Sequence, residues 1–152
     1  MTTPLRLDVR RRAGGGETET ELSLDVPSDL QYVGPAVELI VGRLPPAPLS
    51  PRRIRFNFST ALAEALANAI AYGNHHDPAR VVRVLVQVGH DVVRLHVTDE
   101  GDGFDPDEVP DPTLPERLEL EDGRGLFVLR RLVDDVAFNA KGNSVCLTLL
   151  AG

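Results

Sequence analysis

Two polar side chains in the alanine-rich segment 59–72 have types and a spacing that suit proton and cation chemistry. Glu64 and Asn68 are four residues apart, so on a helix they lie on one face. A carboxylate can act as a general base, and an amide oxygen can bind a hard cation. Two polar residues on the outer face of a surface helix would give the same pattern, so this pair alone leaves both interpretations open.

A second candidate site begins where an apolar segment ends at Thr98. The sequence that follows, DEGDGF, starts with Asp99 and places glycines at Gly101 and Gly103. Glycines allow a backbone to approach a flat ligand closely. A carboxylate at a strand end can accept a hydrogen bond from an exocyclic amine, such as that of adenine. An ordinary acidic turn is the alternative interpretation.

A third candidate is the sequence Gly123-Arg124-Gly125, which precedes a segment predicted to be helical from Leu126. The free backbone N–H groups and the dipole of a helix N-terminus favour anions. The guanidinium of Arg124 adds a charged fork that suits phosphate oxygens. A glycine-rich helix start that merely turns the chain explains the same residues.

Together the three features are more specific than any one of them. They would supply a base, a cation ligand, an acceptor for an amine and contacts to phosphate, and the segment between the last two could close over a ligand. This combination describes a lidded ATP site. The chain has 15 arginines but one lysine, Lys141, and contains neither a G-K-[ST] triplet nor an H-R-D sequence. A Walker A loop and a eukaryotic-type protein kinase site are therefore excluded.

The predicted elements that must position these residues mix strands and helices. We expect strands at 5–10, 19–26, 81–88, 92–98, 136–138 and 144–150, and helices at about 29–42, 59–72 and 125–134. Ser28 is expected to cap the first helix, and Ser59 or Thr60 the second. The proline-rich segment 44–51 is typical of a loop within the domain. This order predicts an α+β sandwich, with an antiparallel or mixed sheet and helices on one face.

Length and composition favour a single domain over residues 1–152, with an N-terminal hairpin in 1–26 and a lid at 99–122. One cysteine, no signal peptide and no long apolar run predict a soluble, cytoplasmic protein without a membrane span. The net charge is -7, and residues 99–122 alone contain 11 acidic groups and one basic group. Nucleic-acid binding usually needs a strongly basic domain, so it is disfavoured.

In this order, the motifs resemble the GHKL ATPase superfamily, and within it the RsbW-like serine-protein kinases that act as bacterial anti-sigma factors. The sequence EALANAIAYGN (64–74) resembles the N box, DEGDGF (99–104) the G1 box, and GRGLF (123–127) the G2 box. The tail DDVAFNAKGNSVCLTL (134–149) resembles the closing hairpin of the family. The resemblance covers about residues 54–150, and residues 1–53 match only loosely.

The resemblance implies a Bergerat-type α/β sandwich that binds ATP and Mg²⁺. It implies that Glu64 is the catalytic base, that Asn68 is the magnesium ligand and that Asp99 recognises adenine. The remaining nucleotide contacts that it implies belong to the glycine-rich boxes: Gly101, Gly103, Gly123, Arg124, Gly125 and Leu126.

The function that the resemblance implies is a serine/threonine-protein kinase that phosphorylates a STAS-fold anti-anti-sigma partner and binds a sigma factor. A homodimer is also implied. Residues 11–21 have no counterpart in the family, and Tyr72 stands where many relatives carry histidine. Two alternatives stay open: an ATP-gated protein-binding module without kinase activity, and a stand-alone ATP-binding part of a histidine kinase.

Overall fold

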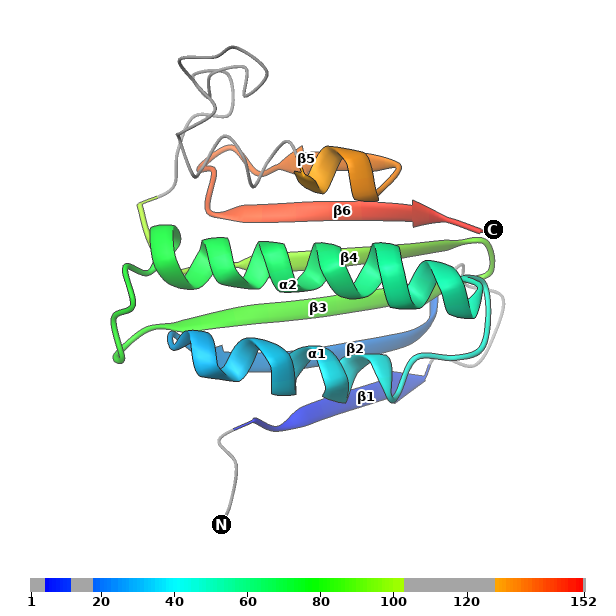
Figure 1. Cartoon of the computed structure of the whole chain (residues 1–152), viewed down its shortest axis with the longest axis horizontal. Coiled ribbons are helices and arrows are strands. Elements are labelled where there is room, and N and C mark those ends of the chain that lie inside the picture. The colour runs from blue at the N-terminus through cyan, green and yellow to red at the C-terminus, as the bar shows by residue number, and fades with distance from the viewer. Residues whose placement is uncertain (1–4, 12–17, 103–127, 152) are drawn as a thin grey trace.

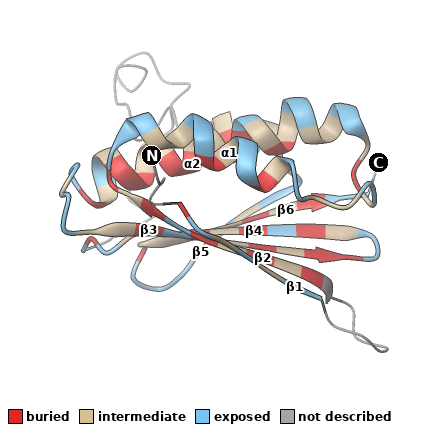
Figure 2. Cartoon of the chain, turned by 90° about the horizontal axis from the view of Figure 1, so that it is seen from below, coloured by how far each residue is buried: buried red, intermediate tan, exposed pale blue. Residues whose placement is uncertain are grey.

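The computed structural model describes residues 5–11, 18–102 and 128–151, and these form two layers (Figure 1). One layer is a six-stranded sheet of order β1-β2-β3-β4-β6-β5, in which every neighbouring pair of strands is antiparallel. Helices cover one face of this sheet (Figure 2). The predicted α+β sandwich is confirmed, with an antiparallel sheet. The strands are β1 (Leu7–Arg11), β2 (Thr18–Pro27), β3 (Val81–Gly89), β4 (Val92–Thr98), β5 (Asp135–Phe138) and β6 (Ser144–Leu150).

The predicted hairpins are confirmed at both ends of the chain. β1 pairs with β2, with Leu7 opposite Leu24 and Val9 opposite Leu22, so these apolar residues share the face that the helices cover. β3 and β4 form the predicted central pair, and β5 and β6 the predicted C-terminal hairpin. Alternation of apolar residues predicts these strands because one sheet face is buried and the other is not.

The first helix begins differently from the prediction. A 3₁₀ turn (Leu30–Tyr32) leads into α1 (Val33–Val41). Asp29 caps this turn, because its Oδ1 accepts a hydrogen bond from the backbone N–H two residues later at 3.0 Å. The prediction that Ser28 is the cap is wrong: Ser28 is buried, and its hydroxyl donates to the carbonyl oxygen of Arg80 at 2.7 Å.

The second helix is longer than predicted. α2 (Ser59–Asn68) is the central part of a continuous helical stretch from 51 to 73. On either side of α2 the helix widens into a π-helical turn, at Arg53–Phe58 and at Ala69–Gly73. In the second of these turns, the N–H of Asn74 donates to the carbonyl oxygen of Ala69, five residues earlier, at 2.8 Å.

The start of this long helix overturns the prediction that Ser59 or Thr60 is its cap. The residue before them, Phe58, already has helical dihedral angles, and the Ser59 hydroxyl donates backward to a carbonyl oxygen inside the helix. The cap is Ser50, whose Oγ accepts from the N–H of Arg53 at 3.1 Å. Pro51 then fits the first turn, where its missing N–H costs nothing.

The core lies between the long helix and the sheet. Leu62, Leu66 and Ile70 of the helix are fully buried, as their spacing predicts. The alanines between them (Ala65, Ala69) are also buried, and their small side chains let the helix lie close to the strands. The helix therefore has little freedom to slide over the sheet, which fixes where its C-terminal end meets the strand ends.

A third helical segment spans 128–132, which is the described part of the helix predicted at 125–134; residues 133 and 134 are no longer helical. Leu129 anchors this segment in the core. None of the helices in the described ranges has the length and apolar content that crossing a bilayer requires.

Candidate functional site

Asp99 lies at the end of β4, against the C-terminal end of the long helix. Along β4, the side chains of Val93, Leu95 and Val97 are all buried beneath the helices. Strand alternation therefore places the Asp99 side chain on the same side of the sheet. A Cβ atom at Gly73 would fall 2.3 Å from the Asp99 Cγ, so glycine at this helix end is what admits the carboxylate.

A second glycine completes this contact. A Cβ atom at Gly101 would fall 2.0 Å from the carbonyl oxygen of Gly73. The N–H of Gly101 also donates to the Oδ1 of Asp99 at 2.8 Å. The structure thus brings Asp99 and Gly101, two of the predicted site residues, together with the end of the helix that carries Glu64 and Asn68.

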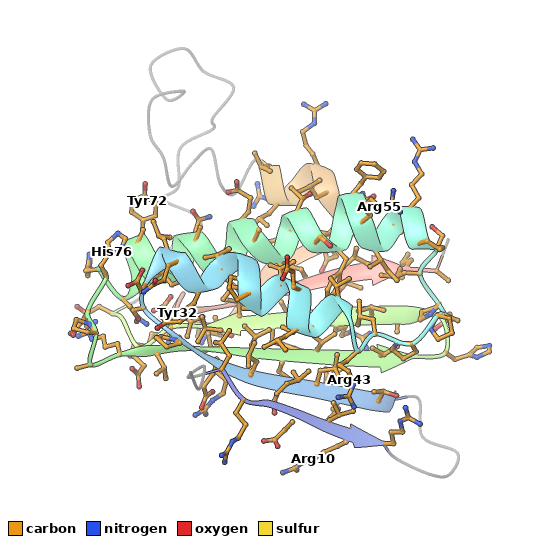
Figure 3. All side chains as sticks on the ribbon, turned by 60° about the horizontal axis from the view of Figure 1, so that its bottom comes forward. Arg10, Tyr32, Arg43, Arg55, Tyr72 and His76 are labelled. Carbon is orange, nitrogen blue, oxygen red and sulfur yellow. The ribbon has the colours of Figure 1, made fainter. Side chains whose placement is uncertain are left out.

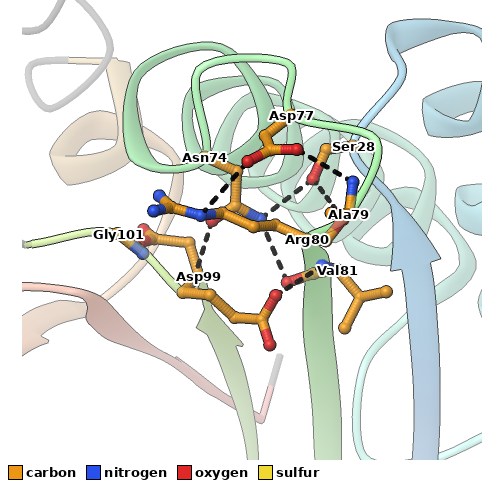
Figure 4. Close-up of polar contacts among 9 residues, drawn as sticks. Ser28, Asn74, Asp77, Ala79, Arg80, Val81, Asp99 and Gly101 are labelled. Atoms are coloured by element: carbon orange, nitrogen blue, oxygen red, sulfur yellow. Dashed lines mark hydrogen bonds and ion pairs between the residues drawn. The ribbon is translucent and has the colours of Figure 1, made fainter.

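Asn74 is a residue of this junction whose role the sequence did not reveal. It is fully buried, and its Nδ2 donates to the hydroxyl oxygen of Ser28 and to the carbonyl oxygen of Val81, each at 3.0 Å (Figure 4). Its Oδ1 accepts from the N–H of Glu100 at 2.8 Å. One amide thereby joins the helix end, the end of β2, the start of β3 and the chain after β4. The sequence signals were its place directly after the glycine that ends the helix and at the end of the segment 64–74 that resembles the N box.

The β5–β6 turn holds Asp99 from the other side. Asn143 Nδ2 donates to the carbonyl oxygen of Asp99, and the Asp99 N–H donates to the carbonyl oxygen of Asn143, both at 2.9 Å. The turn itself is braced by Asn139, whose Oδ1 accepts from three backbone N–H groups, those of Gly142, Asn143 and Ser144. The backbone on both sides of the Asp99 side chain is therefore fixed.

Glu64 and Asn68 lie on α2 and are half-buried. Asn57 lies on the same face of the helix, two turns before Glu64 and three turns before Asn68. Its Nδ2 donates to the carbonyl oxygen of Leu132 at 2.8 Å. This face of the helix is therefore directed toward the segment 128–132. Among the hydrogen bonds and ion pairs between described residues, none involves the side chain of Glu64 or Asn68.

The remaining predicted contacts lie outside the described residues. They are Gly103, Gly123, Arg124, Gly125 and Leu126, and the same is true of the predicted lid beyond residue 102.

Burial shapes the electrostatics of Asp99. Desolvation raises the pKa of its carboxyl above the ordinary value. The hydrogen bond from Gly101 and the nearby charges of Arg80, Lys141 and His75 act in the opposite direction on this pKa and are smaller. A half-buried carboxylate in this position can accept a hydrogen bond from an exocyclic amine such as that of adenine, and the two glycines let the helix end and the chain after β4 approach each other closely.

The helix ends at this junction through two residues with left-handed backbone conformations, His75 (φ 52°) and His76 (φ 57°). The N–H of His76 donates back to the carbonyl oxygen of Ile70 at 2.8 Å, which closes the last turn. Both histidines are exposed. Figure 3 shows Tyr72 and His76 at this end of the helix and Arg55 near its opposite end.

The chain is similar in sequence to known proteins. Residues 26–149 match the histidine kinase-like ATPase domain. The anti-sigma F factor of Geobacillus stearothermophilus is 35% identical over 86 residues, which cover 55% of this chain and 59% of that protein. The serine-protein kinase RsbW of Oceanobacillus iheyensis is 26% identical over 124 residues, which cover 78% of each chain. The match to the anti-sigma F factor thus spans about three fifths of that relative. With most of its length matched, the chain belongs to the family of histidine kinase-like ATPase domains.

Proposed function

We propose that this chain is an ATP-dependent serine/threonine-protein kinase that acts as an anti-sigma factor. The observation that carries the proposal is the junction in which the Asp99 carboxylate lies against Gly73, at the end of the helix that bears Glu64 and Asn68. Relatives named anti-sigma F factor and serine-protein kinase RsbW support the same function.

In this proposal, Asp99 accepts a hydrogen bond from the adenine amine, while Gly101 and Gly103 shape the adenine pocket. Glu64 accepts the proton of a serine or threonine hydroxyl as the hydroxyl oxygen attacks the γ-phosphorus of ATP and ADP leaves. Asn68 would hold Mg²⁺, which supplies positive charge next to the phosphates. The glycine-rich segment that opens at Gly123 would meet the phosphates: its members are Gly123, Arg124, Gly125 and Leu126.

The proposed partners follow from the same function. The protein substrate would be an anti-anti-sigma factor of STAS fold, and the second partner a sigma factor, which would place the chain in the cytoplasm. A homodimer is part of the proposal. Phosphorylation of the substrate would leave the kinase free to bind the sigma factor.

The first test is a calorimetric titration of the purified chain with ATP, with and without Mg²⁺. Asp99→Asn is expected to weaken ATP binding about tenfold to a hundredfold, since a hydrogen bond to a charged group is lost. Asn68→Ala is expected to remove mainly the dependence on Mg²⁺. A chain that binds no adenine nucleotide would refute the nucleotide site.

The second test separates kinase activity from nucleotide binding. Purified chain with Mg-ATP is incubated with candidate STAS-fold proteins encoded in the same genome, and phosphate transfer is followed by mass spectrometry. Glu64→Gln should abolish transfer while ATP binding persists. If wild type binds ATP but phosphorylates none of these proteins, the kinase proposal fails.

A second candidate function is an ATP-gated binding module. The contacts that place Asp99 come from Gly73, Asn74, Gly101 and Asn143, and none of them involves Glu64. Adenine binding could therefore operate without a base. Partner binding that requires ATP and survives Glu64→Gln, together with the absence of phosphate transfer, would favour this candidate.

A further inference from the structure

The peptide group between Asp99 and Glu100 is held at both of its polar atoms by asparagine side chains. Its carbonyl oxygen, on Asp99, accepts from Nδ2 of Asn143 at 2.9 Å. Its N–H, on Glu100, donates to Oδ1 of Asn74 at 2.8 Å. The two asparagines come from different places, one from the end of the long helix and one from the β5–β6 turn.

Fixing this peptide plane fixes the direction of the Asp99 side chain. A peptide group is planar, so holding its oxygen and its N–H sets the backbone rotation on either side of it. The Asp99 N–H is also held by the carbonyl oxygen of Asn143 at 2.9 Å. With both flanking peptide groups held, the Cα–Cβ bond of Asp99 can point only toward Gly73.

The orientation of Asp99 matters because its carboxylate is in close contact with the end of the helix. A Cβ atom at Gly73 would fall 2.3 Å from the Asp99 Cγ, so the carboxylate lies directly against the helix end. A small rotation of the peptide would move the carboxylate into the helix end or away from a ligand. An error of this size at a binding group is costly, because hydrogen bonds to a ligand weaken steeply with angle.

Asn74 is a fully buried polar residue. It is 0% exposed and uses both N–H groups and its oxygen in hydrogen bonds within the fold. Burying an amide is unfavourable unless every group is bonded, and here every group is bonded. An apolar residue at this position would leave the Glu100 N–H without this acceptor and the Val81 carbonyl oxygen without this donor.

We propose that Asn74 and Asn143 form an asparagine clamp, a pair of positioning residues that aim the Asp99 carboxylate at the amine of adenine and so determine the preference for ATP over nucleotides without that amine. The inference rests on the proposed nucleotide site and adds the residues that make the site selective. The clamp touches the backbone next to Asp99 and not the ligand.

The test compares ATP with inosine triphosphate, whose base carries a carbonyl oxygen where adenine carries the amine. Wild type is expected to bind ATP more tightly than inosine triphosphate, by about tenfold or more. Asn143→Ala and Asn74→Ala should each weaken ATP binding by about tenfold and leave the affinity for inosine triphosphate almost unchanged. The ratio of the two affinities is the readout, because a general loss of stability does not change it.

Ser28→Ala is the matched control. It removes a hydrogen-bond partner of Asn74 on the side away from Asp99 and leaves the Glu100 N–H bonded. It should lower the thermal unfolding temperature and keep the preference for ATP. Asn143 lies in a half-buried turn, so Asn143→Ala decides the question even if Asn74→Ala does not fold.

The possible outcomes distinguish a failure of the asparagine clamp from a failure of the nucleotide site. If wild type prefers ATP and the folded Asn143→Ala variant keeps the same preference, the clamp is refuted and the nucleotide site stands. If wild type binds neither nucleotide, the nucleotide site itself is refuted and the clamp with it. Loss of preference in Asn143→Ala, with the preference intact in Ser28→Ala, supports the clamp.

Discussion

The two ends of the long helix are tied to the sheet by different kinds of contact. At the N-terminal end, Arg53 Nη2 lies 2.7 Å from Asp134 Oδ2, and the same oxygen accepts from the N–H of Leu150 at 2.7 Å. The two side chains of the ion pair are 26% and 38% exposed. At the C-terminal end, Asn74 is fully buried and bonded to three other segments of the chain.

This difference indicates which end of the helix must be positioned precisely against the sheet. An exposed ion pair contributes about 0–1 kcal/mol and tolerates movement of its side chains. A buried amide permits only one arrangement of its partners, and removing it leaves each partner unsatisfied at about 1–3 kcal/mol. The end of the helix next to Asp99 is therefore the end at which side chains and backbone have little freedom to move.

The largest expected effect is at the close contact between Gly101 and the helix end. Gly101→Ala places a Cβ atom 2.0 Å from the backbone oxygen of Gly73, so we expect a loss of about 3 kcal/mol in the free energy of unfolding, together with loss of ATP binding. Denaturant unfolding and ATP titration measure both. Gly34→Ala is the control, since a Cβ atom there has nothing within 4 Å, and it should change stability by less than about 1 kcal/mol. Equal unfolding midpoints for Gly101→Ala and wild type would contradict the packing at this end.

The next effect compares one asparagine from each end. Asn74→Ala should destabilise by about 2–3 kcal/mol, because the N–H of Glu100 and the carbonyl oxygen of Val81 lose a buried partner. Asn57→Ala, at the other end, removes one half-buried bond to Leu132 and should cost about 1 kcal/mol. Urea unfolding of the two variants side by side gives the ratio, and a larger loss for Asn57→Ala would reverse the comparison.

Asp99→Asn tests whether the charge of Asp99, at the C-terminal end of the long helix, lowers the free energy of unfolding. Because burial raises the folded-state pKa of Asp99 above its unfolded value, its ionised form destabilises the fold at neutral pH. This cost shrinks as the pH falls through the folded-state pKa, where the folded chain takes up the proton first, and it is gone below the unfolded value. The variant should therefore be at least as stable as wild type at neutral pH, and its advantage should shrink in acid.

Unfolding free energies of wild type and Asp99→Asn, measured from neutral pH down to the ordinary aspartate range, check this sign. An advantage of the variant that grows in acid would show that Asp99 is stabilised as a carboxylate. The same variant should lose ATP affinity, so stability and binding should change in opposite directions.

The smallest effect is expected at the exposed end. Asp134→Ala removes the ion pair with Arg53 and a bond to the Leu150 N–H, and should cost less than about 1 kcal/mol. The loss should be smaller at high ionic strength, because salt screens exposed charges. Denaturant unfolding at low and high salt measures it. A loss as large as that of Asn74→Ala would mean that both ends are equally constrained.

The sequence predicted the parts of the fold that depend on local pattern. All six strands were predicted from short apolar segments and the turns between them, and the buried stripe of α2 followed from Leu62, Leu66 and Ile70. The helix caps were wrong where a serine had a competing partner: Ser28 turns inward to a carbonyl 52 residues away, and Ser59 bonds within a helix that has already begun. Proline content favoured a loop at 44–51, although Pro51 starts the helix.

The site was predictable only where its residues form a motif. Asp99 and Gly101 are close in sequence and lie together as expected. Asn74 and Asn143 act on partners 26 and 44 residues away, and such separations leave no periodic signal. Their roles depend on the strand order, in which β4 lies between β3 and β6.

The π-helical turn at Ala69–Gly73 makes the effect of a deletion depend on its place in the helix. Such a turn contains one residue more than a regular turn requires, so deleting a single residue within it would restore regular α-helical hydrogen bonding. Gly73 and Asn74 would still face Asp99, because the wide turn already takes up the extra residue. Deleting a single residue from the regular part of the helix, within Ser59–Asn68, would instead rotate the two flanking parts relative to each other by about 100° around the helix axis. The helix therefore tolerates the loss of a residue next to this junction better than the loss of one in its regular part.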